Sequence, residues 1–104
     1  MKLTDPVLSV VVPAFNEENT IITVLEGLVA LSFVKEIIVI DDGSTDESSA
    51  ELMDASLSDP RITLITHPVN QGKGQAIFSG WQATKAQNLL FLDGDLFGMR
   101  SLHV

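Results

Sequence analysis

Cysteine and tyrosine are absent from the 104-residue chain, and basic residues are scarce, with 6 Lys and Arg against 14 Asp and Glu. Without cysteine the chain forms neither a disulfide nor a thiolate zinc site, which fits a reducing compartment. The net charge of −8 comes without the clustered cations that bind phosphate backbones, so we expect no nucleic-acid partner. Because only 2 histidines are present, a bound metal ion would rest mainly on oxygen ligands.

Long apolar runs are also missing, since a bilayer span needs roughly 20 apolar residues in succession. The two most apolar windows, residues 7–15 and 21–34, are interrupted by Pro13 and by Glu26. The N-terminal residues lack the basic start and apolar core of a secretion signal. We therefore expect a cytoplasmic protein or, as part of a longer parent protein, a position at the cytoplasmic face of a membrane.

Runs of β-branched residues alternate along the chain with segments of helical periodicity. Strands are expected over residues 7–12, 37–40, 62–66 and 89–92, and helices over about 16–32, 46–57 and 75–87. This β-α-β order predicts an α/β fold with a Rossmann-like, mostly parallel sheet and helices on both faces. The length fits one domain over residues 1–104. Ligands of such sheets bind beyond the carboxyl ends of the strands.

Local signals within these elements predict helix caps and a core. Asn16 is expected to cap the first helix with Glu17 and Glu18 in its first turn, and Ser44 or Thr45 to cap the second. The faces expected to pack on the sheet carry Ala50, Met53 and Leu57 in the second helix and Ile77, Trp81 and Thr84 in the third. The aromatic residues expected mainly in the core are Phe15, Phe33, Phe78, Trp81 and Phe91.

Carboxylates follow three of the four predicted strands. Glu17 comes shortly after the first strand, Asp41 and Asp42 end the second, and Asp93 and Asp95 follow the fourth. Because the carboxyl ends of parallel strands meet at one edge of the sheet, these side chains are expected to lie close together. Oxygen ligands suit Mg²⁺ or Mn²⁺, which shares its coordination with the phosphates of a substrate.

The segment with Asp93 and Asp95 also has a simpler interpretation. Asp93 and Asp95 flank Gly94 in what is, on its own, an ordinary turn sequence with solvated carboxylates. Adjacent carboxylates at Asp41 and Asp42 repel each other unless donors bond one of them. We therefore favour a bound ligand as the reason for the pair.

Lys73 lies between two glycines where a helix is expected to begin, a position whose backbone N–H groups and dipole favour phosphate. The segment does not match the Walker pattern, because His67 stands where that pattern has its first glycine. The dinucleotide and calcium-loop patterns also fail. His67 is expected to be a loop residue with satisfied hydrogen bonds, and no Ser-His-Asp nucleophile arrangement is visible.

Four segments taken together resemble family 2 glycosyltransferases of the GT-A fold. They are Ser-Val-Val-Val-Pro-Ala-Phe-Asn-Glu (9–17), Ile-Val-Ile-Asp-Asp-Gly-Ser-Thr-Asp (38–46), Asn-Gln-Gly-Lys-Gly (70–74) and Leu-Asp-Gly-Asp-Leu (92–96). They follow the family's order and cover most of the chain, which makes the set specific although each motif alone is not. The third segment is most similar to dolichyl- and polyprenyl-phosphate sugar synthases.

The resemblance implies an enzyme that transfers a sugar from a UDP- or GDP-linked donor, with Mg²⁺ or Mn²⁺ neutralising the leaving diphosphate. The residues that would bind the nucleotide sugar are Pro13, Phe15, Glu17, Asp41, Asp42, Lys73 and Asp93. Within this set Asp42 would take the base and Lys73 would lie near the nucleotide or its diphosphate. Asp93 and Asp95 would serve the ribose and the metal ion. A polyprenyl phosphate is the acceptor that the resemblance implies.

Two departures from the family pattern qualify this interpretation. Phe97 stands where polyprenyl-phosphate synthases often have Gln, and the sequence reaches Val104 before an acceptor-binding half or a catalytic base. We therefore expect a donor-binding half that transfers no sugar alone and self-associates through an open sheet edge. The alternatives are a nucleotidyltransferase, a phospho-acceptor signalling domain, and a non-catalytic nucleotide-binding or interaction remnant.

Overall fold

The computed structural model describes residues 7–84 and 88–92, which form one four-stranded parallel sheet. The strands are β1 (Leu8–Ala14), β2 (Val34–Asp42), β3 (Ile62–His67) and β4 (Leu89–Phe91), and the helices are α1 (Ile21–Val29), α2 (Ser48–Ser58) and α3 (Lys73–Ala83). The predicted α/β class and the predicted order of elements are confirmed. No helix of these two stretches has the length and hydrophobicity that crossing a membrane requires.

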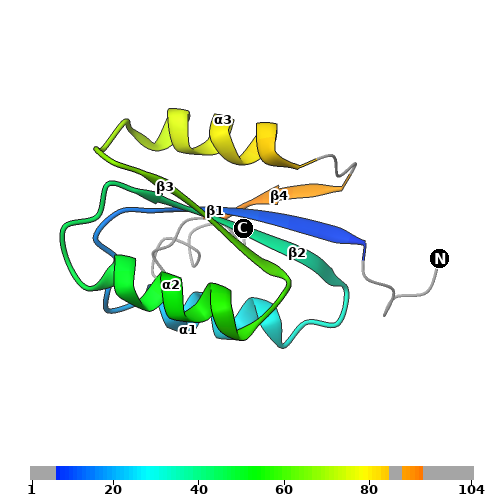
Figure 1. The fold of residues 1–104 in the computed structure, drawn as a ribbon. Coiled ribbons are helices and arrows are strands. Elements are labelled where there is room, and N and C mark those ends of the chain that lie inside the picture. The colour runs from blue at the N-terminus through cyan, green and yellow to red at the C-terminus, as the bar shows by residue number, and fades with distance from the viewer. Residues whose placement is uncertain (1–6, 85–87, 93–104) are drawn as a thin grey trace, which may run out of the picture.

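The sheet lies between two helical layers, with α1 and α2 on one face and α3 on the other (Figure 1). The strand order β3-β2-β1-β4 explains this division. The chain first steps outward from β1 to β2 to β3, and then returns past both strands to place β4 on the far side of β1. Right-handed crossovers in opposite directions put their helices on opposite faces. The order therefore reverses at β1, where such sheets bind ligands beyond the strand ends.

The two central strands are buried on both faces, as their β-branched runs predict. Residues 10–12 of β1 and 37–40 of β2 are at most 1% exposed. The core on the α1 and α2 side consists of Val10, Val12, Ala14, Ile21, Val24, Leu25, Leu28, Val34, Ile37, Val39, Leu52 and Ile62. The smaller core under α3 consists of Val11, Ile38, Ile40 and Ala76.

The predicted helix caps are wrong. Helix α1 begins after Thr20, and its first turn holds no acidic residue. Asn16 instead has a left-handed φ of 52°, and its Oδ1 accepts a hydrogen bond from Thr45 N–H at 2.8 Å. The N-cap position of α2 is Glu47, while the Ser44 hydroxyl accepts a hydrogen bond from Asn16 N–H at 3.0 Å. These residues connect two loops because their short polar side chains bond backbone groups in loops as readily as at helix ends.

The buried faces predicted for the second and third helices are also wrong. Helix α2 buries Ser48 and Leu52, and leaves Leu57 80% exposed. Helix α3 buries Ala76 and Gly80, and leaves Trp81 57% exposed.

The aromatic core was not found, since Phe15, Phe33, Phe78, Trp81 and Phe91 are all at least 36% exposed. Close packing of α3 gives the physical reason on that face of the sheet. A Cβ at Gly80 would lie only 2.8 Å from Ile40 Cδ1. Small residues therefore face the sheet, and the large ones of this helix are turned outward.

Candidate functional site

A cavity of about 420 Å³ lies at the carboxyl ends of β1 and β2, beside the start of α3. Its lining residues are Pro13, Ala14, Phe15, Glu17, Asp42, Asn70, Gly72, Lys73 and Ala76. Five of the residues predicted from the sequence, Pro13, Phe15, Glu17, Asp42 and Lys73, therefore surround one space. Asp93 and Asp95, predicted for the ribose and the metal ion, lie outside the described residues.

The Asp42 carboxylate of this cavity is held by three hydrogen bonds. Its Oδ1 accepts hydrogen bonds from His67 Nδ1–H at 2.8 Å and from Gln71 N–H at 2.9 Å. Its Oδ2 accepts one from Gly72 N–H at 2.9 Å. Burial raises the pKa of Asp42, but these hydrogen bonds outweigh it and leave the pKa lower than usual. The carboxylate is therefore ionised at neutral pH and acts only as an acceptor.

His67 was not singled out as a site residue, and its expected place in a loop is wrong. It is the buried last residue of β3, paired in the sheet register with Asp42. Because an ionised carboxylate cannot donate, Nδ1 carries a proton, and Nε2 makes the second hydrogen bond of the ring, with the Ser79 hydroxyl at 2.9 Å. The alignment of strand ends predicts the pairing of His67 with Asp42, but no sequence pattern identifies Ser79.

Ser79, His67 and Asp42 thus form the Ser-His-Asp chain that the sequence did not reveal. The Ser79 hydroxyl does not have the surroundings of a catalytic nucleophile. Ser79 lies inside α3, and neither it nor His67 lines the cavity. Its effect is to connect β2, β3 and α3 and to hold the Asp42 carboxylate in place.

Asp41 points away from the cavity, because successive side chains of a strand face opposite sides of the sheet. Its Oδ1 accepts from Ser44 N–H at 3.0 Å and its Oδ2 from the Ser49 hydroxyl at 2.5 Å. The structure therefore does not bring Asp41 together with the other predicted residues. Asp41 and Asp42 each have their own protein donors, so their adjacency does not require a ligand, contrary to the expectation from repulsion.

The loops after β1 and β2 are connected by hydrogen bonds next to the cavity. Besides the two bonds of Asn16, the Glu17 N–H donates to the Ser48 hydroxyl at 2.8 Å. The Glu18 N–H donates to Asp46 Oδ2 at 3.3 Å, and Ser48 N–H donates to Asp46 Oδ1 at 2.9 Å. Burial raises the pKa of Asp46, but these bonds outweigh it and lower the pKa overall. The network fixes the backbone that carries Phe15 and Glu17.

Gly43 lets the loop after β2 approach the loop before α3. Its φ is +77°, and a Cβ there would lie 2.6 Å from the Val69 carbonyl carbon. Beside it, the Asn70 side-chain amide donates to the Asp42 carbonyl at 3.2 Å. A side chain at position 43 would therefore displace the segment that leads into Lys73.

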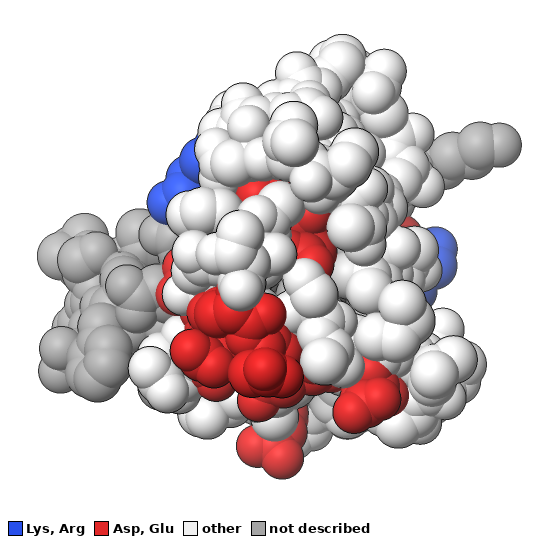
Figure 2. All heavy atoms as spheres, turned by 60° about the vertical axis from the view of Figure 1, so that its left-hand side comes forward, with Lys and Arg blue, Asp and Glu red and all other residues white. Residues whose placement is uncertain are grey.

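The remaining walls of the cavity offer an aromatic face and a cation. Phe15 is 42% exposed at the end of β1, and Lys73 is the first residue of α3, after Gly72 at the N-cap with φ of 96°. Elsewhere this end of the molecule is acidic, with Asp and Glu side chains gathered over it (Figure 2). Glu17, Glu18, Asp46 and Glu47 come from the two loops located there. Lys73 therefore provides positive charge in an otherwise negative region.

The described residues alone do not form a metal centre. Within residues 7–84 and 88–92, no three His, Cys, Asp or Glu side chains are grouped so that they could hold a metal ion. The chain is described as far as Leu92, whose N–H donates to the Val11 carbonyl at 2.9 Å beside the central strand. Asp93 follows it directly in the sequence.

A parallel sheet with this strand order and a cavity that holds a carboxylate and a lysine at its reversal point is typical of nucleotide-binding α/β proteins. The sequence model of Glycosyl transferase family 2 matches residues 9–100 of the chain. The chain therefore belongs to glycosyl transferase family 2, and the family resemblance predicted from the four motifs is confirmed.

The curated relatives agree with this assignment. The chain is 35% identical over 97 residues to a dolichyl-phosphate beta-glucosyltransferase of Trichomonas vaginalis, covering 85% of this chain and 30% of that protein. It is 36% identical over 106 residues to the glucosyl-3-phosphoglycerate synthase of Mycobacterium tuberculosis, covering 93% of this chain and 31% of the synthase. The chain thus spans about a third of the length of the relatives it matches.

Solved structures confirm the GT-A fold. The crystal structure of the Mycobacterium tuberculosis synthase with UDP superposes with a TM-score of 0.72 at 33% identity, covering 88% of this chain and 34% of that one. A mannosyltransferase of Pyrobaculum calidifontis, in complex with GDP-mannose and Mn²⁺, superposes with a TM-score of 0.78 at 23% identity, covering 86% and 28%. The second match shows the shared fold alone.

Proposed function

We propose that this chain forms the part of a family 2 glycosyltransferase that binds the nucleotide-diphosphate sugar. The observation that carries the proposal is the single cavity that joins the Asp42 carboxylate, the Phe15 ring and Lys73 at the reversal point of the sheet. The chemistry of these three groups matches the base and the phosphates of one nucleotide. The mycobacterial synthase that binds UDP supports this assignment.

Asp42 would select the base. As an ionised acceptor it fits the ring N–H that uracil and guanine present, which adenine and cytosine lack. His67, Gln71 and Gly72 hold the carboxylate before a ligand arrives, so little ordering is needed upon binding. The exposed Phe15 ring offers an apolar face on which the base can stack.

Lys73 and the N-terminus of α3 would bind the diphosphate. The first N–H groups of a helix lack intrahelical partners and carry the positive end of the helix dipole. Gly72 precedes them without a side chain, so a phosphate can approach the backbone closely. Because the surroundings are acidic, a divalent cation beside this lysine would reduce the repulsion of a bound diphosphate.

The metal ion of this proposal is Mg²⁺ or Mn²⁺. A second crystal structure of the mycobacterial synthase contains Mn²⁺ together with UDP. By the resemblance of residues 92–96 to the family motif, the ion would rest on Asp95 and Asp93. When bound, it supplies charge that stabilises the leaving diphosphate.

The acceptor proposal depends on the relatives. The Trichomonas vaginalis relative acts by name on dolichyl phosphate, which supports a polyprenyl phosphate acceptor. We propose sugar transfer only for an enzyme of the relatives' full length. For the 104-residue chain we propose donor binding alone. The cytoplasmic location and the self-association expected from the sequence stay predictions.

A thermal-shift titration tests donor binding. The chain is titrated with UDP, GDP and ADP, each with Mn²⁺ or with EDTA. A nucleotide at about 100 times its dissociation constant should stabilise the fold by roughly 2.7 kcal/mol. We expect a Mn²⁺-dependent shift with UDP or GDP and none with ADP.

Matched variants locate the site. Lys73→Ala and Asp95→Ala should reduce the shift, and Lys35→Ala, an exposed lysine of β2 outside the cavity, should leave it unchanged. An equal shift with all three nucleotides would contradict base selection by Asp42. A folded chain that responds to none of them would contradict donor binding and favour a non-catalytic remnant.

A further inference from the structure

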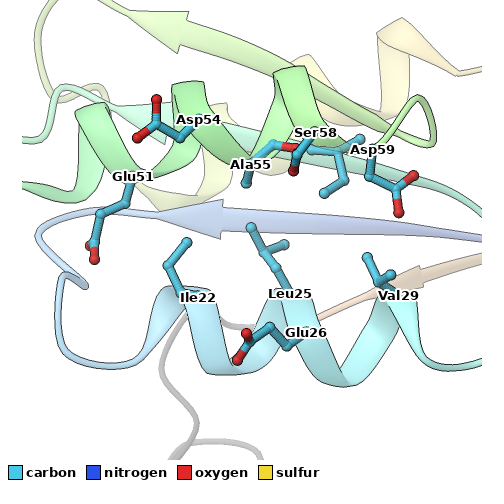
Figure 3. A pocket seen from close by; sticks show the side chains of 10 residues that line it. Ile22, Leu25, Glu26, Val29, Glu51, Asp54, Ala55, Ser58 and Asp59 are labelled. Atoms are coloured by element: carbon cyan, nitrogen blue, oxygen red, sulfur yellow. The ribbon is translucent and has the colours of Figure 1, made fainter.

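A second concave surface lies on the opposite face of the sheet, between α1 and α2 (Figure 3). We call it the α1–α2 groove. It encloses about 610 Å³ and is lined by Ile22, Leu25, Glu26, Val29, Glu51, Asp54, Ala55, Ser58, Asp59 and Ile62. It shares no lining residue with the nucleotide cavity.

The floor of the groove is apolar and follows a helical spacing. Ile22, Leu25 and Val29 lie along α1 at intervals of three and four residues, facing α2 (Figure 3). Ala55 of α2 and Ile62 at the start of β3 complete the floor. Two side-by-side helices with such a floor leave room for the apolar ridge of a third helix.

The rim of the groove is acidic, and one of its four carboxylates has a partner cation. Of its four carboxylates, Asp59 pairs with Arg61 at 3.3 Å. Within residues 7–84 and 88–92, no ion pair reaches Glu26, Glu51 or Asp54. Negative charges bordering an apolar floor complement a cationic, apolar partner.

Glu51 gives an independent sign of a missing partner. Its Oε1 is buried and has no hydrogen-bond partner among the described residues. The side chain extends from α2 toward α1 at one end of the groove (Figure 3). A buried carboxylate oxygen without a donor is destabilising, and a Lys or Arg side chain from outside would provide that donor.

We propose that the α1–α2 groove docks an amphipathic helix whose apolar ridge is bordered by Lys or Arg. Glu51 and Asp59 mark the two ends of the groove (Figure 3). They are about two helical turns, or roughly 12 Å, apart along α2. The partner helix should therefore present apolar residues over these two turns, flanked by Lys or Arg of which one faces Glu51, because Asp59 already pairs with Arg61.

Charge also decides against a second copy of the chain as the occupant. Two copies meeting through this groove would bring the same acidic rims together, which charge repulsion opposes. The net charge of −8 adds to that repulsion. A basic helix meets no such barrier and gains affinity as the salt concentration falls.

A labelled 18-residue synthetic helix tests the proposal, with Leu at helical spacing and Lys two turns apart on both flanks. Binding to the full chain is measured by fluorescence anisotropy. The double variant Glu26→Lys with Glu51→Lys should weaken binding by at least about fivefold, since rim attractions become repulsions. The control Glu18→Lys with Glu47→Lys changes the net charge equally outside the groove and should bind within about twofold of the parent chain.

A charge swap between the peptide and the groove gives a more specific test. A peptide with Glu in place of the flanking Lys should bind the Glu26→Lys, Glu51→Lys variant better than the parent chain. Equal weakening by both double variants would show nonspecific attraction and overturn the proposal. Equal binding of a scrambled peptide of the same composition would overturn it as well, and so would a dimer of the chain that the groove variant dissociates in light scattering.

Discussion

The two faces of the sheet differ in how completely they are covered. Twelve buried residues form the core beneath α1 and α2, whereas four form the core beneath α3. On the α3 side, large residues stay outside the core, and Phe78 and Trp81 lie at the surface with ring centroids 5.9 Å apart. One face is thus a closed core and the other a thin layer.

This difference separates stability from binding. Burial of apolar area is the main source of folding free energy, so most of it comes from the α1 and α2 face. Helix α3 contributes little burial but provides Lys73 and follows the loop that Asp42 holds. The proposed donor site is therefore built on the layer that can shift at the lowest cost in stability.

Truncation of one large apolar residue on each face should give the largest difference in stability between the two faces. Leu52→Ala on α2 removes a fully buried side chain and should cost about 2–5 kcal/mol of unfolding free energy. Phe78→Ala on α3 removes a half-exposed ring and should cost less than about 1 kcal/mol. Urea denaturation measures both. Equal losses would contradict the division into a closed and a thin face.

Two glycines of α3 should respond to alanine substitution with opposite changes in stability. Gly80→Ala places a Cβ against Ile40 and Val11, and should cost about 1–3 kcal/mol by forcing α3 away from the sheet. Gly74→Ala meets no atom within 4 Å, and should gain up to about 1 kcal/mol through helix propensity. Thermal unfolding of the two variants checks the signs. A stabilised Gly80→Ala variant would show that α3 is not closely packed.

Substitutions of His67 test whether its hydrogen bonds to Asp42 and Ser79 support nucleotide binding. His67→Phe keeps a ring but removes both hydrogen bonds, and should cost about 1–3 kcal/mol and weaken nucleotide binding. His67→Asn can still donate to Asp42, so it should recover nucleotide affinity better than it recovers stability. Titration calorimetry and urea denaturation measure the two effects. Equal nucleotide affinity in both variants would show that the hydrogen bond from His67 to Asp42 does not contribute to nucleotide binding.

Acid should produce the smallest and most gradual effect. Hydrogen bonds lower the pKa of Asp42 and Asp46 below the usual value of about 3.9. Hydrogen bonds from Arg61 lower that of Asp59 in the same way. Because the folded-state pKa is the lower one, this stability is present above about pH 4 and is lost as the pH falls further. A pH series of Tm values should fall less steeply for Asp46→Asn than for the parent chain.

The parts of the fold that the sequence predicted are those set by short, repeated patterns. Strands β1 and β2 contain β-branched runs at residues 10–12 and 37–40, which are typical of doubly covered parallel strands. The rule that parallel strands share a carboxyl edge predicted that Glu17 and Asp42 lie close together, and the family resemblance added Phe15 and Lys73.

The parts that could not be predicted depend on partners far away in the sequence. Asn16 has the residue type of a helix cap, and only the folded loops decide that it bonds Thr45 instead. Likewise the burial of Ala76 in preference to Trp81 follows from how closely α3 approaches the sheet, which no local pattern encodes. Ser79 reaches His67 only after both faces have formed.

The pairing of β1 has a consequence for the order in which the chain folds. Val10 pairs with Ile37 on one side and with Leu90 on the other, so its second neighbour is synthesised much later. Contacts between residues distant in sequence form slowly, and a nascent chain folds from its N-terminal part. Strands β1 to β3 with α1 and α2 can therefore assemble on the ribosome before β4 emerges. Until β4 arrives, one edge of β1 stays open to chaperones or to mispairing.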